Sequence, residues 1–167
     1  PIHWEKINDI RKNYDDNFCK IPPHVTLFQR FVEYNDFYNI KKDLVLIDDT
    51  VIFNKVEIFK LSIKYVLVLT TEDNYKINQI RSKIENKLNI QNNSIPHITL
   101  GEFDSEKKAL SAKNNIEKNI LSEKIEISLN NVCYMKKIND QYSIYENIGH
   151  LNNIQPLELV KLISNNI

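Results

Sequence analysis

The sequence has little glycine and little cysteine. Its two glycines are Gly101 and Gly149, so the chain contains neither a glycine-rich dinucleotide fingerprint nor a P-loop. Its two cysteines, Cys19 and Cys133, have no partner at metal-ligand spacing. This argues against a zinc ribbon and against a disulfide framework. The scarcity of these residues therefore excludes two large classes of nucleotide-binding enzyme and two ways of stabilising a small fold.

An excess of charge of either sign is also missing. Lys and Arg total 22 and Asp and Glu total 22, so the formal net charge is zero. A chain without a net positive field has little means of attracting long duplex nucleic acid or an anionic membrane. Any phosphate group must therefore be recognised by a few local side chains.

Long apolar runs are absent as well. Runs such as residues 65–69 are far shorter than the roughly 20 residues that cross a bilayer, and the first residues resemble no signal peptide. We therefore expect a cytoplasmic protein with no membrane partner. A hydrophobic fraction of 42% in 167 residues suffices for one domain over residues 1–167. The start at Pro1 rather than at methionine indicates a processed chain or part of a larger polypeptide.

The spacing of apolar residues predicts a chain in which helices and strands are mixed. No linker rich in Pro, Gly or Ser divides it, which favours one compact unit. Helices are expected at residues 4–17, 75–89, 105–119 and 156–163. Strands are expected at residues 24–28, 44–47 and 98–100, and as two longer strands within 50–69. A closing hairpin is expected from residues 125–129 and 132–136, a turn at 139–140 and a returning strand at 142–145.

One five-residue pattern occurs twice, as Pro23-His24-Val25-Thr26-Leu27 and as Pro96-His97-Ile98-Thr99-Leu100. In a strand, side chains two residues apart share a face, so each histidine projects together with its threonine. Four histidines and five threonines in 167 residues predict only about 0.1 His-x-Thr pair by chance. Two copies with matching flanks therefore point to function.

Two imidazoles and two hydroxyls that converge on one cleft suit a phosphodiester. A neutral imidazole can accept a proton from the attacking oxygen, an imidazolium can protonate the leaving oxygen, and the hydroxyls can hold the nonbridging oxygens. The alternative is a purely structural role, in which the histidine and threonine of each motif only form cross-strand hydrogen bonds. The other two histidines, His3 and His150, have no threonine or carboxylate at meaningful spacing and receive no role.

The two motifs resemble those of the 2H phosphoesterase superfamily, which includes 2′-5′ RNA ligase-like proteins and cyclic phosphodiesterases. The resemblance extends from about Trp4 to Leu151, including the strand pair formed by residues 56–59 and 66–69. It implies an α+β fold that is bilobal and pseudo-twofold, with two antiparallel sheets around a central cleft and helices outside. The lobes would cover roughly residues 1–70 and 71–167.

The resemblance also implies a reaction that uses neither metal nor cofactor. Its catalytic set would be His24, Thr26, His97 and Thr99. Relatives often carry a basic residue after the second motif, where this chain has Gly101-Glu102. Substrate binding is therefore assigned to residues elsewhere, with aromatic rings for base stacking and cations for phosphate: Phe28, Tyr142, Arg30 and Lys136, with Lys137 as a further candidate cation.

The expected substrate is a 2′-5′ oligoadenylate or similar short RNA, because the chain resembles viral members of the superfamily. If the protein is viral, we expect it to act in the cytoplasm of the host cell. One alternative is hydrolysis of 2′,3′-cyclic nucleotides in RNA end processing. An alternative of another class is a non-catalytic nucleotide-binding module, although binding alone does not require two groups that transfer protons.

Overall fold

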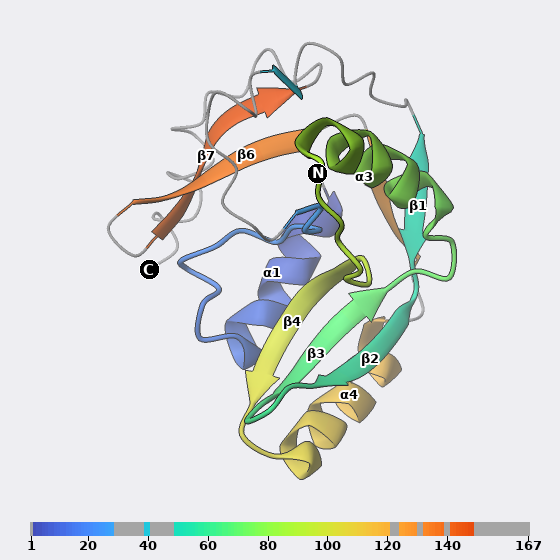
Figure 1. Cartoon of the computed structure of the whole chain (residues 1–167). Coiled ribbons are helices and arrows are strands. Elements are labelled where there is room, and N and C mark those ends of the chain that lie inside the picture. The colour runs from blue at the N-terminus through green and yellow to red at the C-terminus, as the bar shows by residue number, and fades with distance from the viewer. Residues whose placement is uncertain are drawn as a thin grey trace.

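The computed structural model describes residues 2–28, 39–40, 49–120, 124–129, 132–138 and 141–148 (Figure 1). Three helices and seven strands lie in these ranges. The helices are α1 (Ile2–Tyr14), α3 (Tyr75–Leu88) and α4 (Glu106–Ile120). The strands are β1 (Thr50–Phe53), β2 (Lys55–Lys60), β3 (Tyr65–Thr70), β4 (His97–Phe103), β5 (Ile125–Ser128), β6 (Val132–Ile138) and β7 (Gln141–Ile148).

All strand pairs in the described ranges are antiparallel. The strands form one three-stranded sheet in the order β2-β3-β4 and two pairs, β1-β5 and β6-β7. This arrangement confirms the α+β class and the antiparallel pairing. It also confirms the strand pair that the family resemblance placed at residues 56–59 and 66–69, because Val56 pairs with Leu69 and Phe59 with Val66.

Three expectations about strands need correction. Residues 24–28, all of which the structure describes, form neither a strand nor a helix. The stretch within 50–69 holds three strands rather than two, since the chain leaves the β1-β5 pair at Asn54 and enters the three-stranded sheet at β2. The segment at 125–129 is not part of the β6-β7 hairpin, because its strand β5 pairs with β1.

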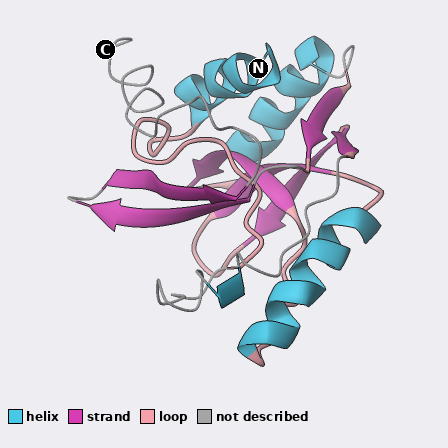
Figure 2. Ribbon diagram, turned by 90° about the horizontal axis from the view of Figure 1, so that it is seen from above, coloured by secondary structure: helices cyan, strands magenta, loops and turns pink. Residues whose placement is uncertain are grey.

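The hydrophobic core covers one face of the three-stranded sheet and extends to the β1-β5 pair and to α3. Along β4, Ile98 and Leu100 are each 1% exposed and point into the core, whereas His97 and Thr99 on the opposite face are half-buried. Helix α1 packs on β4, and α4 packs on β2, β3 and β4. Figures 1 and 2 show these two helices on the same side of the sheet and α3 on the other. The motif-bearing face of β4 therefore looks away from α1 and α4.

Several expectations lie outside the described residues, namely the strand at 44–47, the turn at 139–140 and the helix at 156–163. The bilobal arrangement, the lobe boundaries near residue 70 and the single-domain extent remain predictions. Across the described ranges, no helix combines the length and the apolar character that a bilayer-spanning helix needs.

The end of α1 approaches β4 at Gly101. A Cβ atom at this position would lie 2.5 Å from the carbonyl oxygen of Tyr14 and 2.7 Å from the Tyr14 Cβ. These distances are shorter than any normal van der Waals contact, and the nearest atom is backbone, which cannot move aside cheaply. Only glycine therefore allows α1 to end so close to the sheet.

We expect Gly101→Ala to destabilise the fold by about 1–3 kcal/mol, because the methyl group forces the end of α1 away from β4. The free energy of unfolding in urea measures the effect. Ser111→Ala, at an exposed position on α4, is the matched control and should change it by less than about 0.5 kcal/mol. An unfolding midpoint for Gly101→Ala equal to that of the parent protein would contradict the contact.

Candidate active site

The second motif is built into the sheet. His97 opens β4 and pairs with Thr70, and Thr99 pairs with Val68 on the central strand β3. The period of a strand sends both side chains to the face opposite the buried Ile98 and Leu100. The alternation predicted from the sequence is confirmed at this motif.

The first motif is held by tertiary contacts instead. Val25 and Leu27 pack partly buried against the hydrophobic core. The main-chain carbonyl of Thr26 accepts a hydrogen bond from Arg81 Nη2 at 3.2 Å, and that of Leu27 accepts one from Asn92 Nδ2 at 2.9 Å. Side chains of α3 and the following loop thus donate to carbonyls that a neighbouring strand would otherwise have satisfied. These contacts hold the segment in place although it is not a strand.

The two imidazoles are anchored in the same way. His24 Nδ1 lies 2.8 Å from the Pro22 carbonyl oxygen, and His97 Nδ1 lies 2.7 Å from the Ile95 carbonyl oxygen, two residues upstream in each case. A carbonyl oxygen only accepts, so Nδ1 must carry the proton in both rings. Each Nε2 is then the nitrogen that can take up or release a proton.

Burial lowers the pKa of His24 below its ordinary value of 6.5. The positive charges of Arg11 and His97 lower it further, whereas the Pro22 carbonyl and the Asp15 carboxylate act in the opposite direction. The effect of His97 means that the two motif histidines lie within electrostatic range of each other. The structure therefore brings together the two histidines that are 73 positions apart in the sequence (97 minus 24).

A buried ion pair lies at the end of α1, near the first motif. Arg11 is 2% exposed and donates through Nε to Asp15 Oδ2 at 2.9 Å, while Asp15 Oδ1 accepts from the Asn17 main chain at 2.9 Å. The sequence analysis missed this pair, although Arg and Asp four residues apart at a helix end are a readable signal. Arg11 keeps a positive charge close to His24 and so favours its neutral form.

Phe59 is a second residue that the sequence analysis missed. Its ring meets the His97 ring edge to face, with the ring centres 5.2 Å apart and an angle of 75° between the planes. Such a contact restricts the orientation of the imidazole. The contact runs diagonally across the sheet, because Phe59 does not lie opposite the β3 partner of His97, and it could not be read from the alternation of residues alone.

The residues predicted to bind substrate are placed only in part. Phe28 packs against the hydrophobic core. Tyr142 on β7 pairs with Lys137, and Lys136 on β6 pairs with Ser143. Arg30 lies outside the described residues. Their contact with substrate stays a prediction.

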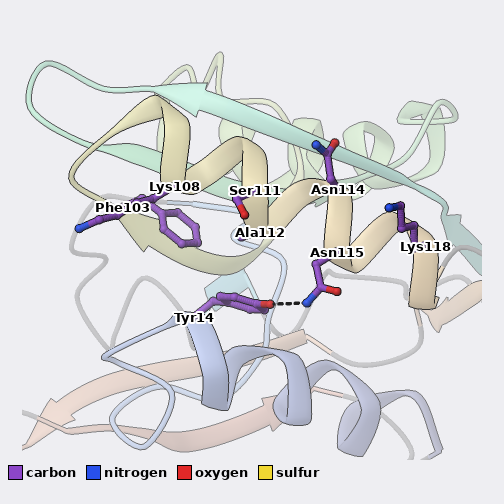
Figure 3. A pocket seen from close by; sticks show the side chains of 8 residues that line it. All are labelled: Tyr14, Phe103, Lys108, Ser111, Ala112, Asn114, Asn115 and Lys118. Atoms are coloured by element: carbon purple, nitrogen blue, oxygen red, sulfur yellow. Dashed lines mark hydrogen bonds between the residues drawn. The ribbon is translucent and has the colours of Figure 1, made fainter.

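A surface pocket of about 590 Å³ lies between α1 and α4, away from the motifs (Figure 3). The Tyr14 hydroxyl accepts a hydrogen bond from Asn115 Nδ2 at 2.8 Å across it. The pocket contains none of the four motif residues; its lining is Tyr14, Phe103, Lys108, Ser111, Ala112, Asn114, Asn115 and Lys118. Because it offers neither imidazole, we place the chemistry at the motifs. In the described part of the chain, no three His, Cys, Asp or Glu side chains gather where they could hold a metal ion.

Comparison with known families gives the family of the chain. A model of the 2′-5′ RNA ligase superfamily matches residues 1–141, which include both motifs. The chain belongs to this superfamily, the 2H phosphoesterases. Membership supports a phosphoesterase type of function for the protein. Among curated proteins, no sequence matches the chain.

The lowered pKa of His24 has a measurable consequence. We expect the NMR titration of its ring protons to have a midpoint below 6.5, because burial disfavours the charged form. The unfolded chain then binds more protons than the folded one as the pH falls below 6.5, so stability decreases on acidification. His24→Gln should remove that part of the pH dependence of the unfolding free energy. A midpoint at or above 6.5 would contradict the described environment.

Proposed function

We propose that this 2H phosphoesterase is a metal-independent phosphodiesterase that cleaves 2′-linked RNA phosphodiesters, with 2′-5′ oligoadenylates as its preferred substrates. One observation carries the proposal: the two motif histidines share the same Nδ1 anchor. Each ring is therefore committed to one tautomer, with Nε2 left for proton transfer. A module that only bound nucleotides would have no need of two rings prepared in this way.

The two histidines take different roles because their surroundings differ. His24 is neutral at pH 7, since burial and neighbouring cations lower its pKa, and it acts as the general base. His97 acts as the general acid, its ring steadied by Phe59. Each proton transfer contributes on the order of 100- to 10,000-fold to the rate.

Cleavage of a 2′-5′ linkage then proceeds by in-line displacement. Nε2 of His24 removes the proton from the neighbouring 3′-hydroxyl, whose oxygen forms a bond to phosphorus. The bond from phosphorus to the 5′-oxygen breaks, and Nε2 of His97 gives its proton to that oxygen. The products are a 2′,3′-cyclic phosphate and a free 5′-hydroxyl, so one proton is taken and one is returned.

Thr26 and Thr99 serve as donors to the nonbridging phosphate oxygens, where negative charge increases in the transition state. Thr99 lies on β4, which pairs with β3, and this pairing holds the main chain that carries its hydroxyl in a fixed position. The zero net charge of the chain suits a short oligonucleotide held by such local groups rather than a long duplex.

We expect His24→Ala and His97→Ala each to lower kcat/KM for 2′-5′ triadenylate by at least about 100-fold, because each removes one proton transfer. Cleavage is followed by chromatography in the presence of EDTA. His3→Ala is the matched control, since this histidine has no threonine two residues later, and it should retain the parent rate.

The substrate panel also contains 3′-5′ triadenylate and adenosine 2′,3′-cyclic phosphate. Turnover of the cyclic phosphate alone would assign the protein to RNA end processing instead. No turnover of any substrate, or parent rates in both histidine variants, would refute catalysis by the two motifs.

The assignment of base and acid predicts a bell-shaped dependence of kcat/KM on pH. Protonation of the base causes the acidic limb, and the lowered pKa of His24 places the midpoint of that limb below 6.5. Stopped assays between pH 4.5 and 9 measure the profile in the free enzyme. A flat profile, or an acidic limb centred above 6.5, would contradict His24 as the base.

A further inference from the structure

Arg81 lies behind the candidate active site and contacts both motif-bearing segments. Its side chain projects from α3 and the residue is 4% exposed. Nη2 donates to the Thr26 carbonyl at 3.2 Å, and Nη1 donates to the Ser94 carbonyl, three residues before His97. One planar guanidinium thus joins the main chain of the first motif to the segment that leads into the second.

Asn92 reinforces this connection from the loop after α3. Its Nδ2 donates to the Leu27 carbonyl at 2.9 Å, while its Oδ1 accepts from the Ser94 main chain at 3.1 Å. Its own main-chain N–H donates to Glu85 Oε1 on α3 at 2.7 Å. Two hydrogen bonds, to Glu85 and Ser94, therefore fix Asn92, and its third hydrogen bond holds the main chain of the first motif.

The cost of burying Arg81 indicates that its role is geometric. Its Nε is buried and has no hydrogen-bond partner among the described residues. Burying a cation with an unsatisfied donor is expensive, and an apolar side chain of similar size often serves stability as well or better. A guanidinium offers what an apolar side chain does not, namely two terminal nitrogens at a fixed separation.

We propose that Arg81, together with Asn92, is a positioning residue that sets the separation between His24 and His97. The first motif forms no strand, so no sheet register fixes its distance from β4. The donors of Arg81 and Asn92 replace that register with three side-chain hydrogen bonds to main-chain carbonyls. The effect on catalysis rests on the proposed function, whereas the effect on the geometry does not.

Arg81→Met tests the proposal, because it keeps an unbranched apolar stem and removes both donors. We expect kcat for 2′-5′ triadenylate to fall by about 10- to 100-fold with a smaller change in KM, since a displacement of about 1 Å is enough for such a loss. Arg81→Lys, which restores one donor, should recover part of kcat. Ser82→Ala, exposed on the same helix, should match the parent.

A second measurement reports the geometry without requiring turnover. In the parent protein, His97→Gln should raise the NMR pKa of His24, because it removes a positive charge that lowers it. The same substitution in the Arg81→Met background should raise the pKa of His24 by less, because without the Arg81 donors the side chains of His24 and His97 lie farther apart. Arg11 and Asp15, which also act on His24, are present in both backgrounds and cancel in the comparison.

An equal pKa change in both backgrounds, with folded protein, overturns the proposal whether or not the protein is an enzyme. A smaller change in the Arg81→Met background without any turnover supports the positioning role and refutes the proposed function alone. If Arg81→Met fails to fold, Asn92→Ser decides the matter by the same comparison. Serine can still accept from the Ser94 N–H but is too short to reach Leu27.

Discussion

The contact between Tyr14 and Gly101 is the constraint on which the rest of the structure depends. Because Gly101 has no side chain, the last turn of α1 lies directly on β4. The chain then turns through residues 15–20 and brings the first motif to the side of the sheet that carries the second. A bulkier residue at 101 would move the whole first segment, and with it His24.

The site combines a rigid half and an adjustable half. His97 and Thr99 take their places from the hydrogen-bond ladder of β4 with β3, which tolerates no sliding because a shift of one residue would turn Ile98 out of the core. His24 and Thr26 depend instead on side-chain donors from α3 and its following loop. The polar contacts of Arg81 and Asn92 therefore connect the two halves, and the pKa of His24 reports on their distance.

Most of the secondary structure could be predicted from local patterns. The three described helices and the β6-β7 hairpin follow from local patterns, the family resemblance placed the β2-β3 pair, and the motif pattern led to the correct family. The strand expected at residues 24–28 was wrong because the residue types suit a strand, while none of the described strands pairs with them. Phe59 and Arg81 were missed for a related reason, because each contacts a partner that is distant in the sequence. Arg11, in contrast, pairs with a carboxylate four residues later, which is a signal that the sequence does carry.

The sequence by itself determined the two His-x-Thr motifs, which supply the groups that we propose act on a phosphodiester. It also determined, through strand periodicity, which side of β4 presents His97 and Thr99. Only the tertiary structure decided how the two histidines differ. Burial and the charges of Arg11 and His97 lower the pKa of His24, and these effects depend on distances through space that the order of residues along the chain does not specify.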